Sequence, residues 1–497
     1  MGTRTEMLER PAPDLDAGPP RPRRRPTLDD VWTVLGVAAP SLLALMARLP
    51  TIDLAYHLRV GSLVRATHAV PRVDAMTFGA GGGTTVDQHW GAQVLLSIAH
   101  DLDGFASLVA LRGLCVAAIA AFVFAACRAR GASARAACGL TVAMYLVAMP
   151  YLVLRPQLFG AVLFAWCVLV LASRRRHPWL LWTLPFVAAI WANVHGSFPL
   201  VVATASFAWL EDRPLGRDSW TRSAIVTVAT LGATLLNPFG IGAWTYVISL
   251  GSNPTIREAV QEWRPPTTET LAGAMFLVAL VASGGLLARR GRALSWVDLG
   301  WVGGSSLLAL TAQRNILWWA IAVAPLFASL SSRAGSRTAP SPSGESRASR
   351  SVNIAIVSML AVALFVALPW VGRTTPLISG VPPQDLVEEV ARQLDEGERL
   401  FVYQPWASWI EYEAPDVRVF VDSRIEIFPQ HVWRDYREAL AGDADLEEIL
   451  DRWRVDAVLM PVDETQLLTA MDRSPEWSIA LLHREGSLYL RSDGLGD

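Results

Sequence analysis

Apolar residues occur in long runs along most of this chain, and short polar gaps separate the runs. A helix needs about 20 predominantly apolar residues to cross the hydrocarbon core of a bilayer. Runs of roughly this size recur as far as residue 371. They predict eleven membrane-spanning helices, at residues 31–50, 105–127, 136–152, 157–173, 178–194, 196–210, 223–238, 269–288, 294–312, 314–331 and 352–371.

The gaps between the runs are of two kinds, and the two kinds alternate. One kind is rich in arginine and occupies residues 21–25, 128–135, 173–177, 211–222, 288–292 and 333–350. Because cytoplasmic loops of membrane proteins carry an excess of basic residues, we predict that these gaps and the N-terminus are cytoplasmic. The other gaps carry Asp, His, Asn, Gln and Glu side chains and should face the outside. We therefore expect the chemistry of the protein on one face of the membrane.

Composition divides the chain into segments. These are a disordered cytoplasmic tail (1–29), a membrane core (30–331) with an external loop (51–104), a flexible cytoplasmic linker (332–351), a last span (352–371) and an extracytoplasmic domain (376–497). The last segment has strand-like runs at 399–404, 417–422, 455–461 and 487–492, separated by amphipathic stretches. This pattern predicts a small α/β domain, and with about 120 residues it can hold its own core.

The overall composition narrows the function classes. The chain is 52% hydrophobic, and its net charge of −2 gives no sign of nucleic-acid binding. All 43 basic residues are arginine, which suggests a GC-rich bacterial genome and excludes lysine chemistry. There is no P-loop, glycine-rich nucleotide fingerprint or CxxC pair. The four cysteines lie in or beside the apolar runs and are expected to be apolar core residues.

The first external loop carries the first candidate site. Asp53 and His57 are four residues apart, so on a helix that follows Pro50 they share one face. That helix would hold a carboxylate just above the bilayer, with Leu54, Leu58 and Leu63 along the membrane surface. In the alternative interpretation, Asp53 only stabilises the start of the helix and His57 is a solvated surface residue.

Further along the loop, Asp87 and His89 precede a second amphipathic stretch. Together with His68 and Asp74, they give the loop enough carboxylates and imidazoles for a divalent metal such as Mg²⁺ or Mn²⁺. No spacing here is as specific as HExxH, so a polar loop with internal hydrogen bonds is the alternative.

Two arginines fall in gaps of the external kind. Arg155 precedes Gln157 in an RPQ turn, and Arg314 lies in a QRN turn between two apolar runs. Arginine can bind the phosphate of a lipid head group with two hydrogen bonds. The alternative is that each side chain only extends to the membrane interface.

Other external gaps add polar groups. Asn193 and His195 interrupt apolar residues in WANVHGSF, Asn237 begins NPFG, and Glu262 lies in a long loop. Polar groups at a membrane boundary cost free energy unless they line an aqueous or ligand cavity. We therefore predict that these residues line such a cavity, with a simple turn as the alternative for NPFG and a solvated carboxylate for Glu262.

These motifs carry a family resemblance. DLAYH (53–57), VDQHW (86–90), the RPQ turn, WANVHGSF, NPFG, EW (262–263), the QRN turn and VFVDSRIEIF (419–428) together resemble bacterial membrane glycosyltransferases of the GT-C superfamily. The resemblance implies a polyprenyl-phosphate-sugar donor, an acidic catalytic residue at Asp53, and lipid phosphate held by Arg155 and Arg314. One departure is that Leu54 follows Asp53 where many relatives have a second acid, and this leaves metal dependence open.

The sequence thus predicts a polytopic α-helical membrane protein in the bacterial inner membrane. We expect an inverting glycosyltransferase that moves a sugar from a polyprenyl-phosphate donor to the hydroxyl of an extracytoplasmic glycan, lipid or protein. Asp53 and His57 are the candidate catalytic residues. A transporter or lipid flippase, and a non-catalytic membrane scaffold, are the alternatives. Transporters tend to place ionisable residues near the bilayer midplane, whereas those in the apolar runs here, Arg112 and Asp298, lie near the ends.

Overall fold

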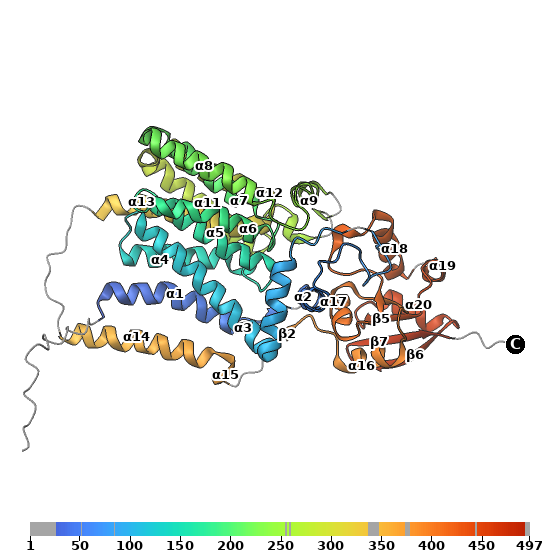
Figure 1. The fold of residues 1–497 in the computed structure, drawn as a ribbon. Coiled ribbons are helices and arrows are strands. Elements are labelled where there is room, and N and C mark those ends of the chain that lie inside the picture. The colour runs from blue at the N-terminus through green and yellow to red at the C-terminus, as the bar shows by residue number, and fades with distance from the viewer. Residues whose placement is uncertain are drawn as a thin grey trace, which may run out of the picture.

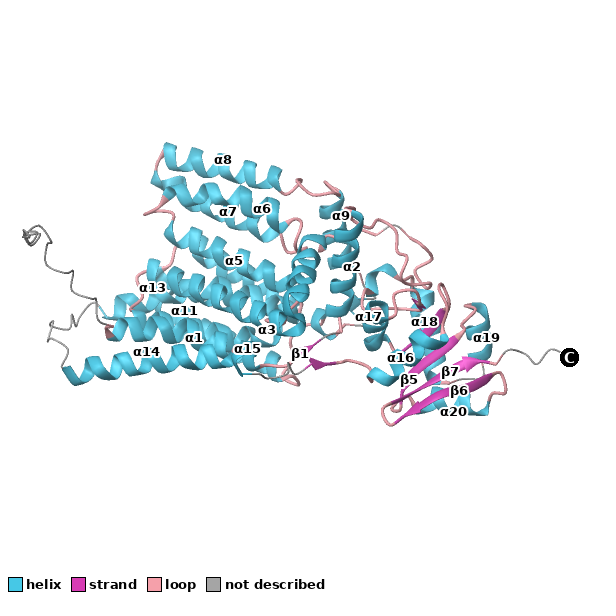
Figure 2. Ribbon diagram, turned by 60° about the horizontal axis from the view of Figure 1, so that its bottom comes forward, coloured by secondary structure: helices cyan, strands magenta, loops and turns pink. Residues whose placement is uncertain are grey.

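The computed structural model describes residues 26–492, apart from 51, 84, 254–255, 258–259, 336–346, 373–377 and 443–444. A bundle of long helices forms one part, and a smaller domain covers one end of it (Figure 1). A second view shows the same arrangement, with α2 (Leu54–Thr67) between the bundle and the domain (Figure 2). The predicted tail 1–29 lies almost wholly outside the described residues, as does most of the linker 332–351.

The bundle follows the apolar runs of the sequence, since each of the eleven runs overlaps a helix. These are α1 (Leu28–Met46), α3 (Trp90–Ala129), α4 (Ala134–Ala148), α5 (Pro156–Ser173), α6 (Thr183–Trp191), α7 (Pro199–Asp212), α8 (Arg217–Ala233), α11 (Leu271–Arg290), α12 (Trp296–Thr311), α13 (Ile316–Gly335) and α14 (Arg347–Ala367). In the described part of the chain, α1, α3, α5 and α11 are long and apolar enough to cross a membrane. The protein therefore has a membrane location, while the number of crossings stays a prediction.

A kink divides α3 where the predicted external loop ends. Asp103 and Gly104 leave the helical backbone conformation, and Gly104 has φ 55°, a left-handed value that favours glycine. Residues before the kink belong to the loop, and residues after it form the apolar run 105–127. About two helical turns beyond the kink, buried Arg112 donates hydrogen bonds to the carbonyl oxygens of Ala47 and Arg48, each at 2.6 Å. It thereby satisfies carbonyl groups left free after α1 ends.

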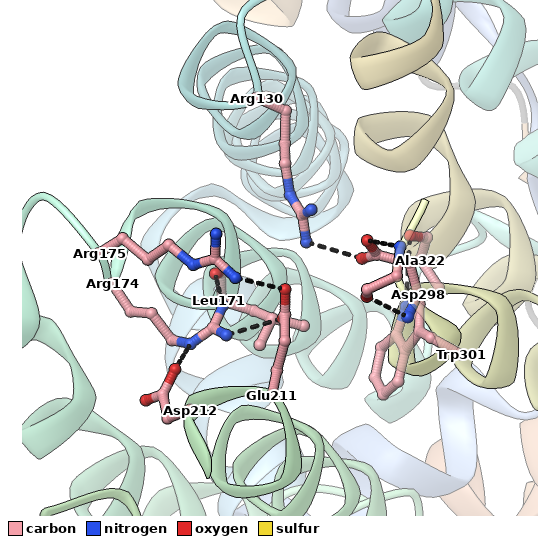
Figure 3. Close-up of polar contacts among 10 residues, drawn as sticks. Arg130, Leu171, Arg174, Arg175, Glu211, Asp212, Asp298, Trp301 and Ala322 are labelled. Atoms are coloured by element: carbon pink, nitrogen blue, oxygen red, sulfur yellow. Dashed lines mark hydrogen bonds and ion pairs between the residues drawn. The ribbon is translucent and has the colours of Figure 1, made fainter. Parts of the chain in front are cut away.

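Buried ion pairs gather at the ends of α3, α5 and α7 and the start of α12 (Figure 3). Arg174 binds Asp212 through Nε at 3.0 Å and Glu211 through Nη2 at 2.7 Å, and only 3% of its side chain is exposed. Arg130 binds Asp298 at 3.2 Å. Charges this buried require such partners, because an unpaired one costs several kcal/mol.

The two kinds of gap lie at opposite ends of the helices. Helix α5 begins after Arg155 and ends before Arg174, and its 18 residues span about 27 Å. Helix α7 likewise begins after His195 and ends at the buried acids Glu211 and Asp212. The arginine-rich gaps and the motif-carrying gaps are therefore separated by the length of the bundle.

The smaller domain contains a five-stranded sheet with the order β4-β3-β5-β7-β6. Its strands are β3 (Arg399–Val402), β4 (Arg418–Val419), β5 (Ala457–Pro461), β6 (Trp477–His483) and β7 (Gly486–Arg491). Strands β4, β3 and β5 are parallel, with Leu400 opposite Ala457, and β7 is antiparallel to both β5 and β6. Four of the strands coincide with the strand-like runs of the sequence, whereas β6 was not predicted.

Helices cover both faces of this sheet. They are α16 (Gln384–Gln393), α17 (Gln404–Glu413), α18 (Gln430–Ala441), α19 (Leu446–Arg452) and α20 (Thr465–Arg473). Side chains alternate between two cores along each strand, as strand geometry requires. In β3, Phe401 packs in one core and Leu400 and Val402 in the other.

The first external loop is part of the smaller domain's core. Phe78 packs in the same core as Phe401, and Thr77 forms a parallel bridge to Val419 at the edge strand β4. Phe78 and Gly79 donate backbone hydrogen bonds to Val419 and Phe420, at 3.0 and 3.2 Å. Strand β1 (Leu49–Pro50) also pairs with β2 (Ile378–Ser379), next to α15 (Pro369–Gly372). The loop therefore ties the domain to the bundle.

Helix α2 is buried between the two parts. We expected Leu54 and Leu58 to lie along the membrane surface, but each is only 1% exposed and packs in the bundle core. The prediction was wrong because α2 is buried from two sides: the bundle covers Leu54 and Leu58, and the domain covers Ala55, which packs in the core that contains Leu400.

Candidate active site

A cavity of about 890 Å³ lies between the end of the bundle and the smaller domain. Nine of the eleven residues predicted from the motifs line it: Asp53, His57, Asp87, His89, Arg155, Gln157, His195, Glu262 and Arg314. They come from gaps far apart in the sequence. The structure therefore brings together the polar groups that the sequence placed on one face.

At one wall, Arg155 bridges two carboxylates. Its Nε lies 2.9 Å from Oδ2 of Asp53, and its Nη1 lies 3.1 Å from Oε1 of Glu262. Asp53 precedes α2, where its side chain makes no capping hydrogen bond and is paired with Arg155. The pKa of Arg155 is raised because the Asp53 carboxylate, and less strongly Glu262, favours the charged guanidinium.

Arg314 lies on the same side of the cavity, in the turn Gln313–Asn315. Its guanidinium stacks on the ring of Trp263, with Cζ 4.5 Å from the ring centroid. In the described part of the chain, no carboxylate lies within 4.0 Å of its nitrogen atoms. Gln157 donates a long hydrogen bond, 3.4 Å, to the backbone oxygen of Arg314 and so connects α5 to this turn.

Three histidines form a row along the cavity. The ring centroids of His57 and His89 are 6.0 Å apart, and those of His89 and His195 are 5.4 Å apart. Burial lowers the pKa of His57 to about 3, and the neighbouring His89 adds to the effect. Burial also lowers the pKa of His195 well below its usual value. These two imidazoles are therefore neutral near pH 7, and His57 is not the solvated residue of the alternative interpretation.

Asp87 is held by several donors. It accepts hydrogen bonds from the Tyr56 hydroxyl at 3.2 Å, from Nε2 of Gln93 at 2.9 Å and from the backbone N–H of His89 at 3.0 Å. Gln93 also lies 3.3 Å from Nδ1 of His57. Asp87 thus orients its neighbours and has few lone pairs left for a ligand.

The smaller domain supplies the opposite wall of the cavity. The lining segment 423–427 belongs to the VFVDSRIEIF motif, but the sequence alone did not identify its side chains as part of the site. Glu426 accepts a hydrogen bond of 2.8 Å from Tyr246 of α9 (Gly242–Ser252), and burial raises the pKa of Glu426. Arg424 binds Asp74 at 2.7 Å and lies over the ring of Tyr56 at 4.6 Å. These contacts connect the domain directly to the cavity.

Sequence reasoning also did not identify Gln88 as a residue of the cavity. Its side chain is 1% exposed, it lines the cavity, and its Oε1 has no hydrogen-bond partner in the described structure. A Cβ atom at Gly196 would lie only 2.4 Å from Nε2 of Gln88, so a larger residue there would force the Gln88 amide to move. A ligand hydroxyl in the cavity could satisfy this buried acceptor.

Asn193 and Asn237 do not line the cavity, and their polar groups have structural partners. Nδ2 of Asn193 donates to the oxygens of Ala189 and Leu236, both at 2.7 Å, and its Oδ1 accepts from Trp90 at 2.9 Å. Oδ1 of Asn237 accepts from the backbone N–H of Phe239 at 2.8 Å. NPFG is therefore a turn closed by its asparagine, as the alternative interpretation held.

The described side chains offer no ready-made group of ligands for a divalent metal. Over the described residues, no three His, Cys, Asp or Glu side chains are grouped closely enough to hold a metal ion. Two carboxylates of the cavity, those of Asp53 and Glu262, are both bound to Arg155.

Comparisons with solved structures identify the fold. The archaeal oligosaccharyltransferase AglB from Archaeoglobus fulgidus, in complex with an inhibitory peptide and a dolichol-phosphate, matches with a TM-score of 0.58 and 13% identity over 93% of this chain and 74% of that one. The apo form of the enzyme gives a TM-score of 0.53 at 12% identity, with the same coverage. Apo ArnT from Cupriavidus metallidurans gives 0.50 at 13% identity, over 92% of this chain and 97% of that one.

No protein-family model matches the chain, and no curated protein matches its sequence. The likeness is thus one of structure, and it extends over nearly the whole chain. It confirms, at the level of fold, the resemblance that the motifs indicated. The chain shares its fold with the oligosaccharyltransferase AglB and with ArnT.

Proposed function

We propose that this protein is an integral-membrane inverting glycosyltransferase. It moves a sugar from a polyprenyl-phosphate donor to an acceptor hydroxyl outside the cytoplasm. The observation that carries the proposal is the position of Arg314. This cation lacks a carboxylate partner in the described structure, and it lines the same cavity as the acidic residue Asp53.

Arg314 is suited to hold the donor's phosphate. A guanidinium gives paired, charge-assisted hydrogen bonds to phosphate oxygens, and stacking on Trp263 fixes the plane of the group. Arg155 adds positive charge nearby, although its own donors already bind Asp53 and Glu262. The leaving phosphate is a weak base, so it needs electrostatic stabilisation more than it needs a general acid.

Asp53 is suited to act as the general base. Its ion pair with Arg155 uses Oδ2, so Oδ1 can accept the proton of the acceptor hydroxyl. The hydroxyl oxygen forms a bond to the anomeric carbon as the bond from that carbon to the phosphate oxygen breaks. The proton goes to Asp53 and the electron pair to the lipid phosphate. A single displacement of this kind inverts the anomeric configuration.

Neutral histidines suit the sugar end of such a cavity. His57 and His195 stay uncharged near pH 7, so they can exchange hydrogen bonds with sugar or acceptor hydroxyls without competing for the phosphate. The fold shared with AglB, whose solved complex contains a dolichol-phosphate, supports a lipid-phosphate ligand.

The direct test is transfer by the purified full-length chain in liposomes. A polyprenyl phosphate carrying a radiolabelled sugar is supplied with bacterial envelope extract as acceptor. We expect the label to move to the acceptor and free polyprenyl phosphate to appear in equal amount. If the label stays on the lipid while the lipid crosses the bilayer, the protein is a flippase.

The proposal includes an orientation in the bacterial inner membrane, with the cavity and residues 376–497 outside and the arginine-rich gaps inside. The four native cysteines are buried, so introduced cysteines can report on sidedness. In intact cells, an impermeant thiol reagent should label Thr465→Cys in the smaller domain and spare Thr221→Cys at the arginine-rich end. The opposite pattern would overturn the orientation.

A further inference from the structure

Arg155 occupies the space between two acidic side chains from distant parts of the chain. Asp53 precedes α2, Glu262 lies in the turn Gln261–Trp263, and Arg155 precedes α5. Two separate nitrogen atoms of one guanidinium make the two contacts, at 2.9 and 3.1 Å. The side chains are only partly exposed, at 27% for Arg155 and 25% for Asp53. This is the bridging geometry that a cation adopts between carboxylates.

The two neighbouring carboxylates keep the Arg155 guanidinium charged. Two carboxylates that face one cavity repel each other unless a cation lies between them. Asp53 and Glu262 both favour the guanidinium form of Arg155, which arginine keeps throughout the accessible pH range. A divalent ion that bridged Asp53 and Glu262 would have to take the place between them that the Arg155 guanidinium fills.

A second arginine is available for the ligand. Arg314 interacts electrostatically with Glu262, Arg155 and Asp53, so it belongs to the same group of charges. Unlike Arg155, it is stacked on an aromatic ring and has no carboxylate within ion-pair distance in the described residues. The two arginines thus have different roles: Arg155 neutralises the two carboxylates, and Arg314 remains available to a ligand in the cavity.

We propose that the Arg155 guanidinium serves as a built-in cation between Asp53 and Glu262, so that this site binds a lipid phosphate without a divalent metal. The inference rests on the proposed lipid-phosphate function. Arg155 acts here as a positioning residue that fixes both carboxylates, while Arg314 contacts the phosphate.

The first test measures binding of Mn²⁺, an ion that carboxylates ligate well. Binding is followed by the loss of the free-ion signal in electron paramagnetic resonance, with the purified full-length chain in detergent. The wild type should bind no stoichiometric Mn²⁺. R155N, which frees both carboxylates, should gain about one Mn²⁺ per chain, and R155N combined with E262Q should lose it again. R130N is the matched control, because it frees the single carboxylate of Asp298 at the far end of the bundle.

The second test needs no variant. Polyprenyl phosphate binding to the wild type is measured by tryptophan fluorescence before and after exhaustive treatment with EDTA. We expect the dissociation constant to change by less than about twofold, a difference that corresponds to under about 0.4 kcal/mol. Stoichiometric Mn²⁺ binding by the wild type, loss of lipid affinity in EDTA, or failure of folded R155N to gain Mn²⁺ would overturn the proposal. If no lipid phosphate binds even with Mn²⁺ present, the proposed function itself fails, which is a different result.

Discussion

Arg314 lies against the face of Trp263, with its Cζ 4.5 Å from the centroid of the indole ring. The ring shields one side of the guanidinium from water and restricts its rotation. Its N–H donors stay directed along the plane of the group, where they can meet an anion. A preorganised cation of this kind loses little conformational entropy when a phosphate binds.

Replacement of Arg314 by glutamine should weaken the binding of polyprenyl phosphate by about 1.5–3 kcal/mol, the value of hydrogen bonds to a charged group. Isothermal titration with the purified chain measures the change. Arg72 provides a matched control, since it also lies over an aromatic ring, Phe239, but does not line the cavity. Equal affinities of Arg314→Gln and the wild type would return Arg314 to the membrane-interface interpretation.

Sequence reasoning identified much of this site because the motifs share one kind of gap. The gaps that contain Asp53, Arg155, Glu262 and Arg314 have no excess of arginine. Because successive helices run in opposite directions, such gaps lie at the same end of the bundle. Their pairing could not be predicted, since it depends on how segments a hundred residues apart pack. Asn193 resembled the site residues by position, yet its amide joins the Leu236 backbone.

The pH dependence of stability should reveal the buried imidazole of His57. In the unfolded chain, a histidine gains a proton below about pH 6.5, whereas folded His57 stays neutral down to about pH 3. Its neutral form therefore supports the fold fully above pH 6.5, and this support is lost as the pH falls below that value.

At pH 5.5 the loss amounts to about 1.4 kcal/mol for this one group. Thermal unfolding in detergent at pH 7.5 and 5.5 measures it. His57→Gln should show a smaller decrease in melting temperature between the two pH values than the wild type. His68→Gln changes an exposed histidine at the opposite end of the same helix and should behave as the wild type does. An identical pH effect in His57→Gln and the wild type would contradict this account.

Phe78 lies outside residues 376–497 in the sequence, but it should stabilise the smaller domain that these residues form. Only 8% of Phe78 is exposed, and it packs against Phe420 with ring centroids 5.2 Å apart. Phe78→Ala should therefore destabilise the domain by about 3 kcal/mol, as is usual for a buried aromatic residue. Hydrogen exchange of residues 399–491 in the full chain should become faster, whereas Val73→Ala, at a residue 54% exposed, should have no such effect. Unchanged exchange in Phe78→Ala would mean that residues 376–497 hold a complete core alone.

The smaller domain also shows which features could not be predicted from sequence patterns. The strand-like runs marked β3 and β5 because both are continuous apolar stretches, buried on both faces. Strand β6 alternates less clearly and contains exposed Leu482, so its pattern was weak. The role of Glu426 in the cavity depends on its contact with Tyr246, 180 residues away, which no local pattern encodes.

Asp53→Asn tests the central claim most directly. Asparagine keeps the size of the side chain but cannot accept the acceptor's proton, so turnover should fall by about 100-fold or more. Donor affinity and expression should stay near those of the wild type, because Arg314 still faces the phosphate. The measurement is the transfer rate of labelled sugar from polyprenyl phosphate at saturating donor, beside a binding titration on the same preparation. A 100-fold loss of turnover with unchanged binding is the predicted result, and near-normal transfer by Asp53→Asn would contradict the assignment of Asp53 as the base.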